Sequence, residues 1–170
     1  MQRIKMGAEV GNTYNRTTPT DALVIFGVTG DFAHKMIFPA LYTMAKRGAL
    51  SVPVVGVAAT KWSLTQLRKQ ATDSIKLSGR INDRDALDHL HSLLQYVNID
   101  YSDLGTFKAL KQALGDARCP THYLATPPAL FTTVIKGLGV AGLADQARVI
   151  VEEPFGCGPA SAREFNRIVL

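Results

Sequence analysis

Five short apolar runs, rich in β-branched residues, alternate along this chain with longer amphipathic segments. The runs are ALVIF (22–26), VPVVGVA (52–58), YVNIDY (96–101), THYLAT (121–126) and ARVIVE (147–152). Nearly continuous apolar strands of this kind are typical of parallel sheets, because helices cover both faces of such sheets. The alternation therefore predicts an α/β fold with a doubly wound, mostly parallel sheet of the Rossmann type.

The segments between the runs carry helix signals. Helices are predicted over residues 32–47, 63–78, 83–95, 103–114, 129–138 and 159–170. Pro39 should kink or split the first helix, since proline has no N–H and its ring clashes with the preceding turn. Ser63 and Gln66 have the spacing of a capping box at the start of the second. In the third, the leucines up to Leu94 form one apolar stripe.

Composition limits the class of protein. The 170 residues, 46% apolar and 19% charged, fit one globular domain over residues 21–170, preceded by a polar tail over residues 1–20. That tail has no apolar core of a secretion signal, and no run approaches the length of a membrane span. The net charge of +5 is scattered, with no basic face interleaved with aromatics, which disfavours nucleic-acid binding. Cys119 and Cys157 lack metal-ligand spacing, so we expect free thiols in the reducing cytoplasm.

The stretch GVTGDFAHKM (27–36) directly follows the first predicted strand and opens a predicted helix. Free amides at a helix N-terminus suit a phosphate, with Gly27 making the turn and Gly30 permitting close approach. Ala33 replaces the third glycine of the usual dinucleotide fingerprint and is still small enough for close packing. A merely tight turn fits the pattern equally well. Asp31 is expected to cap the helix or to bond loop amides.

Three segments, in order, resemble the glucose-6-phosphate dehydrogenase family. GVTGDFAHKMIFPALY resembles its coenzyme loop G-x-x-G-D-L-A-x-[RK]-K, and HYLATPPALF resembles its Y-L-A-x-P-P segment. RVIVEEPFG, followed by SAREFN, resembles its R-[IV]-[IV]-x-E-K-P-F-G and the helix after it. The order and spacing match over about residues 21–170.

The resemblance implies a coenzyme-binding domain of an oxidoreductase. The family oxidises glucose 6-phosphate to 6-phosphogluconolactone, usually with NADP⁺, in the pentose phosphate pathway. The implied coenzyme residues are Gly27, Val28, Thr29, Gly30, Asp31, Phe32 and Ala33 at the pyrophosphate, Asp100 and Tyr101 near the adenine, and Thr126, Pro127, Pro128 and Phe131 at the nicotinamide end.

The chain also departs from the family pattern. Glu153 stands where the family has a lysine that binds the sugar phosphate, which reverses the charge at that position. Ala59 stands where a basic residue often meets the 2′-phosphate of NADP⁺, and Met36 is also uncharged, so NAD⁺ stays open as the coenzyme. Lys61, two positions beyond Ala59, is the candidate replacement.

The family's R-I-D-H-Y-L-G-K segment, which supplies phosphate ligands, is missing from these 170 residues, and none of the four histidines falls in a matched catalytic motif. We therefore expect a coenzyme domain truncated before the substrate domain and inactive alone. The alternative is a truncated, non-enzymatic paralogue that binds a nucleotide or a protein partner.

Overall fold

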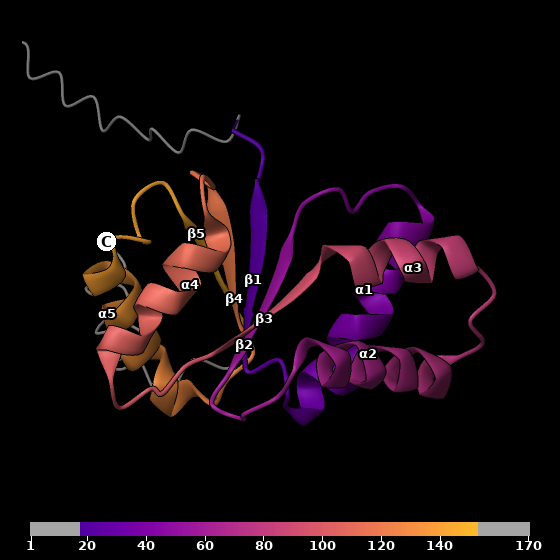
Figure 1. Ribbon diagram of the computed structural model, residues 1–170, viewed down its shortest axis with the longest axis horizontal. Helices are drawn as coiled ribbons and strands as arrows, with labels where there is room; N and C mark the ends of the chain where they lie inside the picture. The colour runs from indigo at the N-terminus through magenta and orange to yellow at the C-terminus, as the bar shows by residue number, and fades with distance from the viewer. Residues whose placement is uncertain (1–17, 153–170) are drawn as a thin grey trace, which may run out of the picture.

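The computed structural model describes residues 18–152, which form one five-stranded parallel sheet with helices on both faces (Figure 1). The strands are β1 (Ala22–Phe26), β2 (Val54–Ala58), β3 (Leu94–Asn98), β4 (Pro120–Leu124) and β5 (Arg148–Val151). They lie in the order β3-β2-β1-β4-β5, and every neighbouring pair is parallel. The predicted doubly wound, Rossmann-like sheet is confirmed.

The helices are divided between the two faces of the sheet. They are η1 (Ala33–Ile37), α1 (Phe38–Lys46), α2 (Leu64–Ser78), α3 (Arg84–Leu93), η2 (Leu104–Thr106), α4 (Phe107–Leu114), η3 (Pro128–Leu130) and α5 (Phe131–Ala141). Figure 1 shows α1, α2 and α3 on one face and α4 and α5 on the other. The predicted helix at 159–170 lies outside the described residues.

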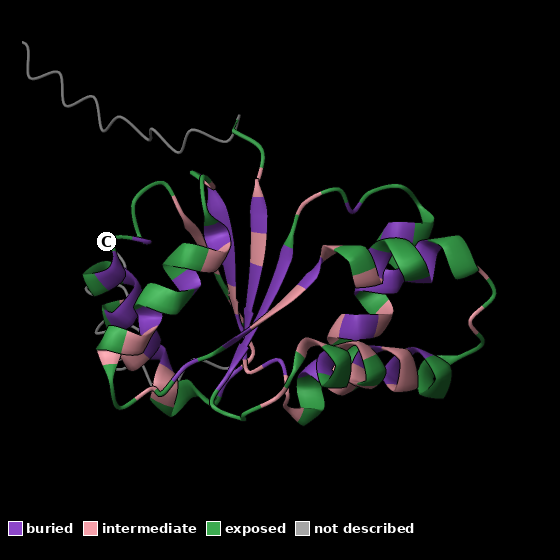
Figure 2. Ribbon diagram, in the orientation of Figure 1, coloured by how far each residue is buried: buried purple, intermediate pink, exposed green. Residues whose placement is uncertain are grey.

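The sheet is buried on both faces, and two separate apolar clusters form there. Successive side chains of β1 alternate between them, because side chains of a strand point to opposite faces. Ile25 joins the cluster under α1, α2 and α3, whereas Val24 and Phe26 join the cluster under α4 and α5. Accordingly, β1, β2 and β4 are almost continuously buried (Figure 2), whereas β3 is only partly buried and the edge strand β5 has no fully buried residue.

The predicted boundary between the third helix and the third strand was wrong. Leu94 fits the apolar stripe of a helix, but it begins β3 directly after α3 ends at Leu93. Its side chain is 1% exposed and packs in the same cluster as Leu87 and Leu90. A buried leucine fits the spacing of a helix stripe and that of a strand equally well. The third strand therefore begins at Leu94 and ends at Asn98, earlier at both ends than the predicted range 96–101.

One predicted helix signal is confirmed. Ser63 Oγ accepts from the Gln66 amide at 3.2 Å, and Gln66 Oε1 accepts from the Ser63 amide at 2.7 Å, which is the capping box of α2. Pro39 does not split the first helix, because Ile37 and Phe38 keep α-helical dihedrals between η1 and α1. It lies in the first turn of α1, directly after the π-helical segment η1, so what changes there is the hydrogen-bond register.

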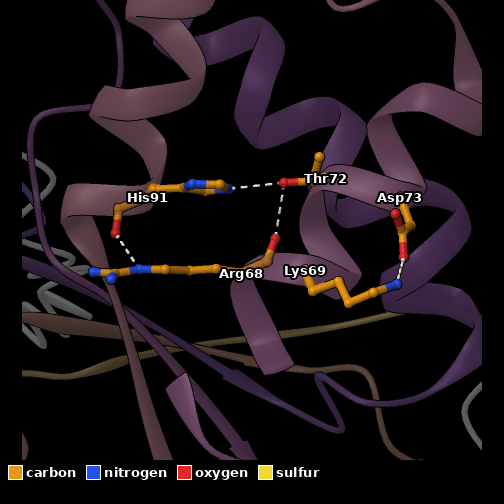
Figure 3. Close-up of polar contacts among 5 residues, drawn as sticks. All are labelled: Arg68, Lys69, Thr72, Asp73 and His91. Atoms are coloured by element: carbon orange, nitrogen blue, oxygen red, sulfur yellow. Dashed lines mark hydrogen bonds and ion pairs between the residues drawn. The ribbon is translucent and has the colours of Figure 1, made fainter. Parts of the chain in front are cut away.

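A polar cluster joins α2 to α3 (Figure 3). Arg68 Nε donates to the His91 carbonyl at 3.0 Å, and Thr72 Oγ1 lies 3.0 Å from His91 Nε2. Burial, with the nearby Arg68 charge, lowers the pKa of His91. Lys69 and Asp73 form an exposed i,i+4 pair beside it. The contacts of Arg68 and Thr72 with His91 link α2 to α3, whereas the Lys69–Asp73 pair lies within α2.

Candidate functional site

The carboxyl ends of all five strands lie at one edge of the sheet, because the strands are parallel. Chain order reverses between β1 and β4, and ligands of open α/β sheets bind at such a switch point. A cleft of about 400 Å³ opens there. Its lining comes from the turn after β1, the end of β4, the start of α5 and the residue after β5: Gly30, Asp31, Phe32, Leu124, Ala125, Thr126, Pro127, Pro128, Phe131 and Glu152.

Gly27 is required at the first position of the turn. Its φ is +79°, a conformation that residues with a Cβ rarely adopt. A Cβ there would also lie 2.7 Å from the Ala125 carbonyl oxygen and 3.1 Å from Cγ2 of Thr126. The turn after β1 and the end of β4 therefore approach each other closely only because residue 27 is glycine.

The turn presents backbone donors to the cleft edge. The Gly27 amide donates to the Val57 carbonyl at 2.8 Å, and the Gly30 amide donates to the Gly27 carbonyl at 2.9 Å. By contrast, the amides of Thr29, Asp31 and Phe32 donate to no residue within 18–152. Free amides at the start of a helical segment form a binding place for a phosphate group.

Asp31 does not cap the helix, so that prediction was wrong. Its carboxylate accepts from Lys35 Nζ at 2.5 Å, one helical turn further on. This hydrogen bond, with the charge of Lys35, lowers the pKa of Asp31. Both side chains are exposed, and the i,i+4 spacing of the pair was visible in the sequence.

The loop after β2 is held by a set of side-chain donors. Asn98 Nδ2 donates to the carbonyls of Ala58, Ala59 and Thr60 at 2.9–3.1 Å. The Tyr96 hydroxyl also donates to the Thr60 carbonyl, and Thr60 Oγ1 lies 3.1 Å from Thr29 Oγ1 in the glycine turn. Ala59 and Lys61, two predicted coenzyme residues, are exposed on this loop.

Asp100 and Tyr101 follow β3. The Asp100 carboxylate accepts from the Ser102 amide at 2.9 Å and from the Ser102 hydroxyl at 2.6 Å, and these bonds lower its pKa. The Tyr101 hydroxyl is buried near the Gly27 backbone and makes no well-formed hydrogen bond to a described residue. Burial raises the pKa of Tyr101 to about 12, so the hydroxyl stays protonated.

The side of the cleft formed by β4 and β5 is apolar with a few polar groups. Thr126 is only 9% exposed, and its hydroxyl has no partner within the described chain. The Tyr123 hydroxyl donates to the Glu152 carboxylate, and the Tyr123 ring lies nearly parallel to Phe32 with centroids 6.5 Å apart. Burial and then the Glu152 carboxylate raise the pKa of Tyr123.

Of the predicted coenzyme residues in the turn, Gly30, Asp31 and Phe32 line one cleft with Thr126, Pro127 and Phe131. Val28 and Ala33 are instead fully buried in the apolar cluster under α1, α2 and α3. Ala59, Lys61, Asp100 and Tyr101 lie in loops at the same edge of the sheet. Glu153 lies outside the described residues. Sequence reasoning assigned no role to Asn98, Tyr96, Tyr123 or Glu152. Their positions at strand ends were a usable signal, but their hydrogen-bond partners lie 29 to 40 residues away in the chain.

Two features that residues 18–152 lack bear on the kind of site. Within residues 18–152 no group of three His, Cys, Asp or Glu side chains is arranged to hold a metal ion. Over the same range no helix has both the length and the apolarity needed to cross a membrane. Of the histidines, His34 follows the turn closely but lies half-buried, and its Nδ1 has no described partner.

Comparison with known proteins decides the family. The family profile described as "Glucose-6-phosphate dehydrogenase, NAD binding domain" matches residues 24–170. The chain belongs to the glucose-6-phosphate dehydrogenase family. Glucose-6-phosphate 1-dehydrogenase 1 of Mycobacterium tuberculosis is 42% identical over 147 residues, which are 86% of this chain and 31% of that protein. The glucose-6-phosphate 1-dehydrogenase of Dickeya dadantii is 34% identical, again over 86% of this chain and 31% of its own length.

Solved structures agree with this assignment. The crystal structure of glucose-6-phosphate 1-dehydrogenase from Mycobacterium avium superposes with a TM-score of 0.84 at 42% identity, over 89% of this chain and 33% of that one. A glucose-6-phosphate dehydrogenase in complex with glucose 6-phosphate superposes with a TM-score of 0.76 at 28% identity, over 88% and 34%. The chain therefore spans about a third of the length of these relatives and corresponds to their N-terminal, NAD-binding part.

Proposed function

We propose that this chain binds a nicotinamide dinucleotide, NADP⁺ or NADPH first and NAD⁺ as the second choice, at the carboxyl edge of its sheet. The pyrophosphate lies on the free amides of Thr29, Asp31 and Phe32. One observation carries the proposal: Gly27 brings the turn against β4 and leaves those amides without partners within the described residues. Each such amide is a donor at the start of a helical segment, where a negative charge is favoured.

The two halves of the dinucleotide lie on opposite sides of the turn. The adenosine half lies toward the loops after β2 and β3, beside Ala59, Lys61, Asp100 and Tyr101. Lys61 is exposed and offers the positive charge that a 2′-phosphate needs. The nicotinamide half enters the cleft beside Thr126, Pro127 and Phe131, where the unpartnered Thr126 hydroxyl fits a ligand with its own donors and acceptors.

When bound, the dinucleotide supplies the acceptor for a hydride from a sugar. We propose that this domain, residues 21–170, serves glucose 6-phosphate oxidation in the cytoplasm only when a substrate domain is supplied. A general base against the sugar hydroxyl is needed for that reaction. These 170 residues lack the R-I-D-H-Y-L-G-K segment, and Glu153 replaces the lysine expected at the sugar phosphate. The chain alone is therefore expected to bind coenzyme without oxidising the sugar.

The second candidate function is a non-enzymatic module that binds a nucleotide or a protein partner. The carboxylate at position 153 favours it, since it has the wrong sign for a phosphate ligand. Fusing this chain to the substrate domain of a relative, with and without Glu153→Lys, separates the two. Activity in both fusions would support the enzymatic function. Activity only in the Glu153→Lys fusion would show that Glu153 abolishes it.

A direct test uses the purified 170-residue chain. Titration with NADPH, followed by the fluorescence of the reduced nicotinamide, is expected to saturate, and NADP⁺ and NAD⁺ are expected to compete with it. An absorbance assay with glucose 6-phosphate and NADP⁺ is expected to show no reduction. Absence of any dinucleotide binding would contradict the proposed function, and steady turnover would contradict the predicted inactivity.

A further inference from the structure

The helix that follows the phosphate-binding turn has an irregular hydrogen-bond pattern. In η1 the Phe38 amide donates to the carbonyl of Ala33, five residues back, rather than to His34, four residues back. Continuing that pattern, the donor for the His34 carbonyl would be the amide of residue 39. Residue 39 is proline and has no N–H, so the helix itself leaves the His34 carbonyl without a donor.

Ser74 supplies the missing donor from another helix. It lies in α2, is only 2% exposed, and its hydroxyl donates to the His34 carbonyl. The amide of the same residue, His34, donates to the Gly30 carbonyl at 3.1 Å. A chain of hydrogen bonds thus runs from Ser74 through the backbone of His34 to Gly30, the second glycine of the turn.

We propose that Ser74 is a positioning residue of the coenzyme site. By holding the His34 carbonyl, it keeps η1 in its π-helical register and thereby fixes the direction of the free amides of Asp31 and Phe32. The inference rests on the proposed dinucleotide binding, because the amides matter only if a phosphate occupies the turn.

The alternative register shows why the hydroxyl matters. Without Ser74, the His34 carbonyl regains a donor only if the Phe38 amide moves from Ala33 to His34. One residue of an α-helix corresponds to a rotation of about 100°. That shift turns the residues before His34 relative to α1, and it moves the amides of the turn away from the cleft edge. The remaining choice, a buried carbonyl with no partner, lowers stability.

Ser74→Ala in the full 170-residue chain tests the positioning role. The expected result is a dissociation constant for NADPH raised about fivefold to tenfold, with a lowered melting temperature. Ala71→Gly is the matched control, because Ala71 is fully buried in α2, and glycine weakens the helix without touching His34. The control is expected to lower the melting temperature and leave the dissociation constant within twofold. Equal affinity losses in the two variants would overturn the positioning role.

A double-mutant cycle tests the contact even if no dinucleotide binds. Pro39→Ala gives residue 39 an N–H that the His34 carbonyl can accept. In that background Ser74→Ala is expected to lower the melting temperature by much less than in the wild-type chain, where about 4 °C is expected. Equal losses in both backgrounds would overturn the assigned role of Ser74. Failure of the wild-type chain to bind NADPH would contradict the proposed function and leave this cycle informative.

Discussion

The loop after β2 and the loop after β4 flank the same glycine turn, yet they differ in how their polar groups are satisfied. In the β2 loop, the amide of Asn98 and the hydroxyl of Tyr96 hold three carbonyls, and Thr60 reaches Thr29. In the β4 loop, two prolines remove backbone donors and the Thr126 hydroxyl is buried without a described partner.

The difference indicates that the β2 side of the site is ordered by internal hydrogen bonds, whereas the β4 side retains a polar group without a partner among the described residues. The β2 loop is fixed by the protein itself before any ligand arrives, which reduces the ordering cost of binding. The β4 loop retains an unused hydrogen-bonding group in an apolar cleft. A buried polar group without a partner lowers stability, so this side is the one that a ligand can complete.

The largest effect is expected at Gly27, which joins the two sides. Gly27→Ala combines a strained φ of +79° with a Cβ 2.7 Å from the Ala125 carbonyl oxygen. We expect a loss of about 3 kcal/mol in unfolding free energy, measured by urea denaturation, and loss of NADPH binding. Gly48→Ala is the matched control: its φ is +65°, but nothing lies within 4 Å of the added Cβ, so only about 1 kcal/mol is expected. Similar losses at both positions would show that the close approach to β4 contributes nothing.

His122 gives the β4 side a pH dependence. It is fully buried on β4, its Nε2 lies 3.1 Å from the Leu143 carbonyl, and burial lowers its pKa from 6.5 to about 4. The unfolded chain therefore takes up a proton more readily than the folded one. Stability is expected to fall as the pH drops from about 6.5 to about 4, by about 3 kcal/mol in total from this residue.

Urea denaturation of the wild-type chain and of His122→Phe at pH 7 and pH 4.5 measures that contribution. The variant is expected to lose less stability over this interval. Since burial also lowers the pKa of His91, a smaller loss from that residue remains in both proteins. Identical pH profiles would show that His122 does not carry the effect.

Two substitutions of smaller effect compare the loops directly. Asn98→Ala is expected to lower the free energy of unfolding, measured by urea denaturation, by about 1 kcal/mol, because three carbonyls lose a donor.

Thr126→Val keeps the shape of the side chain and removes a hydroxyl that has no partner among the described residues. The free energy of unfolding is therefore expected to rise by about 1 kcal/mol, while NADPH binding weakens severalfold. A Thr126→Val variant that loses stability would contradict the difference between the loops.

The smallest effect is expected at the exposed pair Asp31–Lys35. Although the carboxylate is one of the predicted coenzyme residues, its side chain is 80% exposed and that of Lys35 is 67% exposed. Lys35→Gln is expected to leave the melting temperature unchanged, since exposed ion pairs contribute little. A large drop would show that the pair holds the turn after all.

The sequence predicted what depends on local pattern. Apolar runs predicted all five strands, and Ser63 with Gln66 predicted the start of α2, because both signals lie within a few residues. Leu94 was misplaced since a buried leucine satisfies a helix stripe and a strand equally. The bond from Ser74 to His34 spans 40 residues and depends on the π-helical register, which has no signature in hydrophobic spacing.

In the site, the glycine turn was predictable from its position after a strand and before a helix. The partners of its neighbours were not, because Asn98 and Tyr96 reach the β2 loop only through the pairing of β2 with β3. That the Thr126 hydroxyl lacks a hydrogen-bond partner among the described residues was also not predictable, because it depends on how the β4 loop packs against Gly27 in the folded structure.

We propose that backbone amides of the glycine turn hold the phosphates of a dinucleotide. An NMR titration of the ¹⁵N-labelled chain with NADP⁺ tests it most directly, with each amide followed separately. We expect the amides of Thr29, Asp31 and Phe32 to show the largest chemical-shift changes and to saturate together with signals from the β4 loop. Saturable binding that leaves those three amides unmoved, or no binding at millimolar NADP⁺, would contradict it.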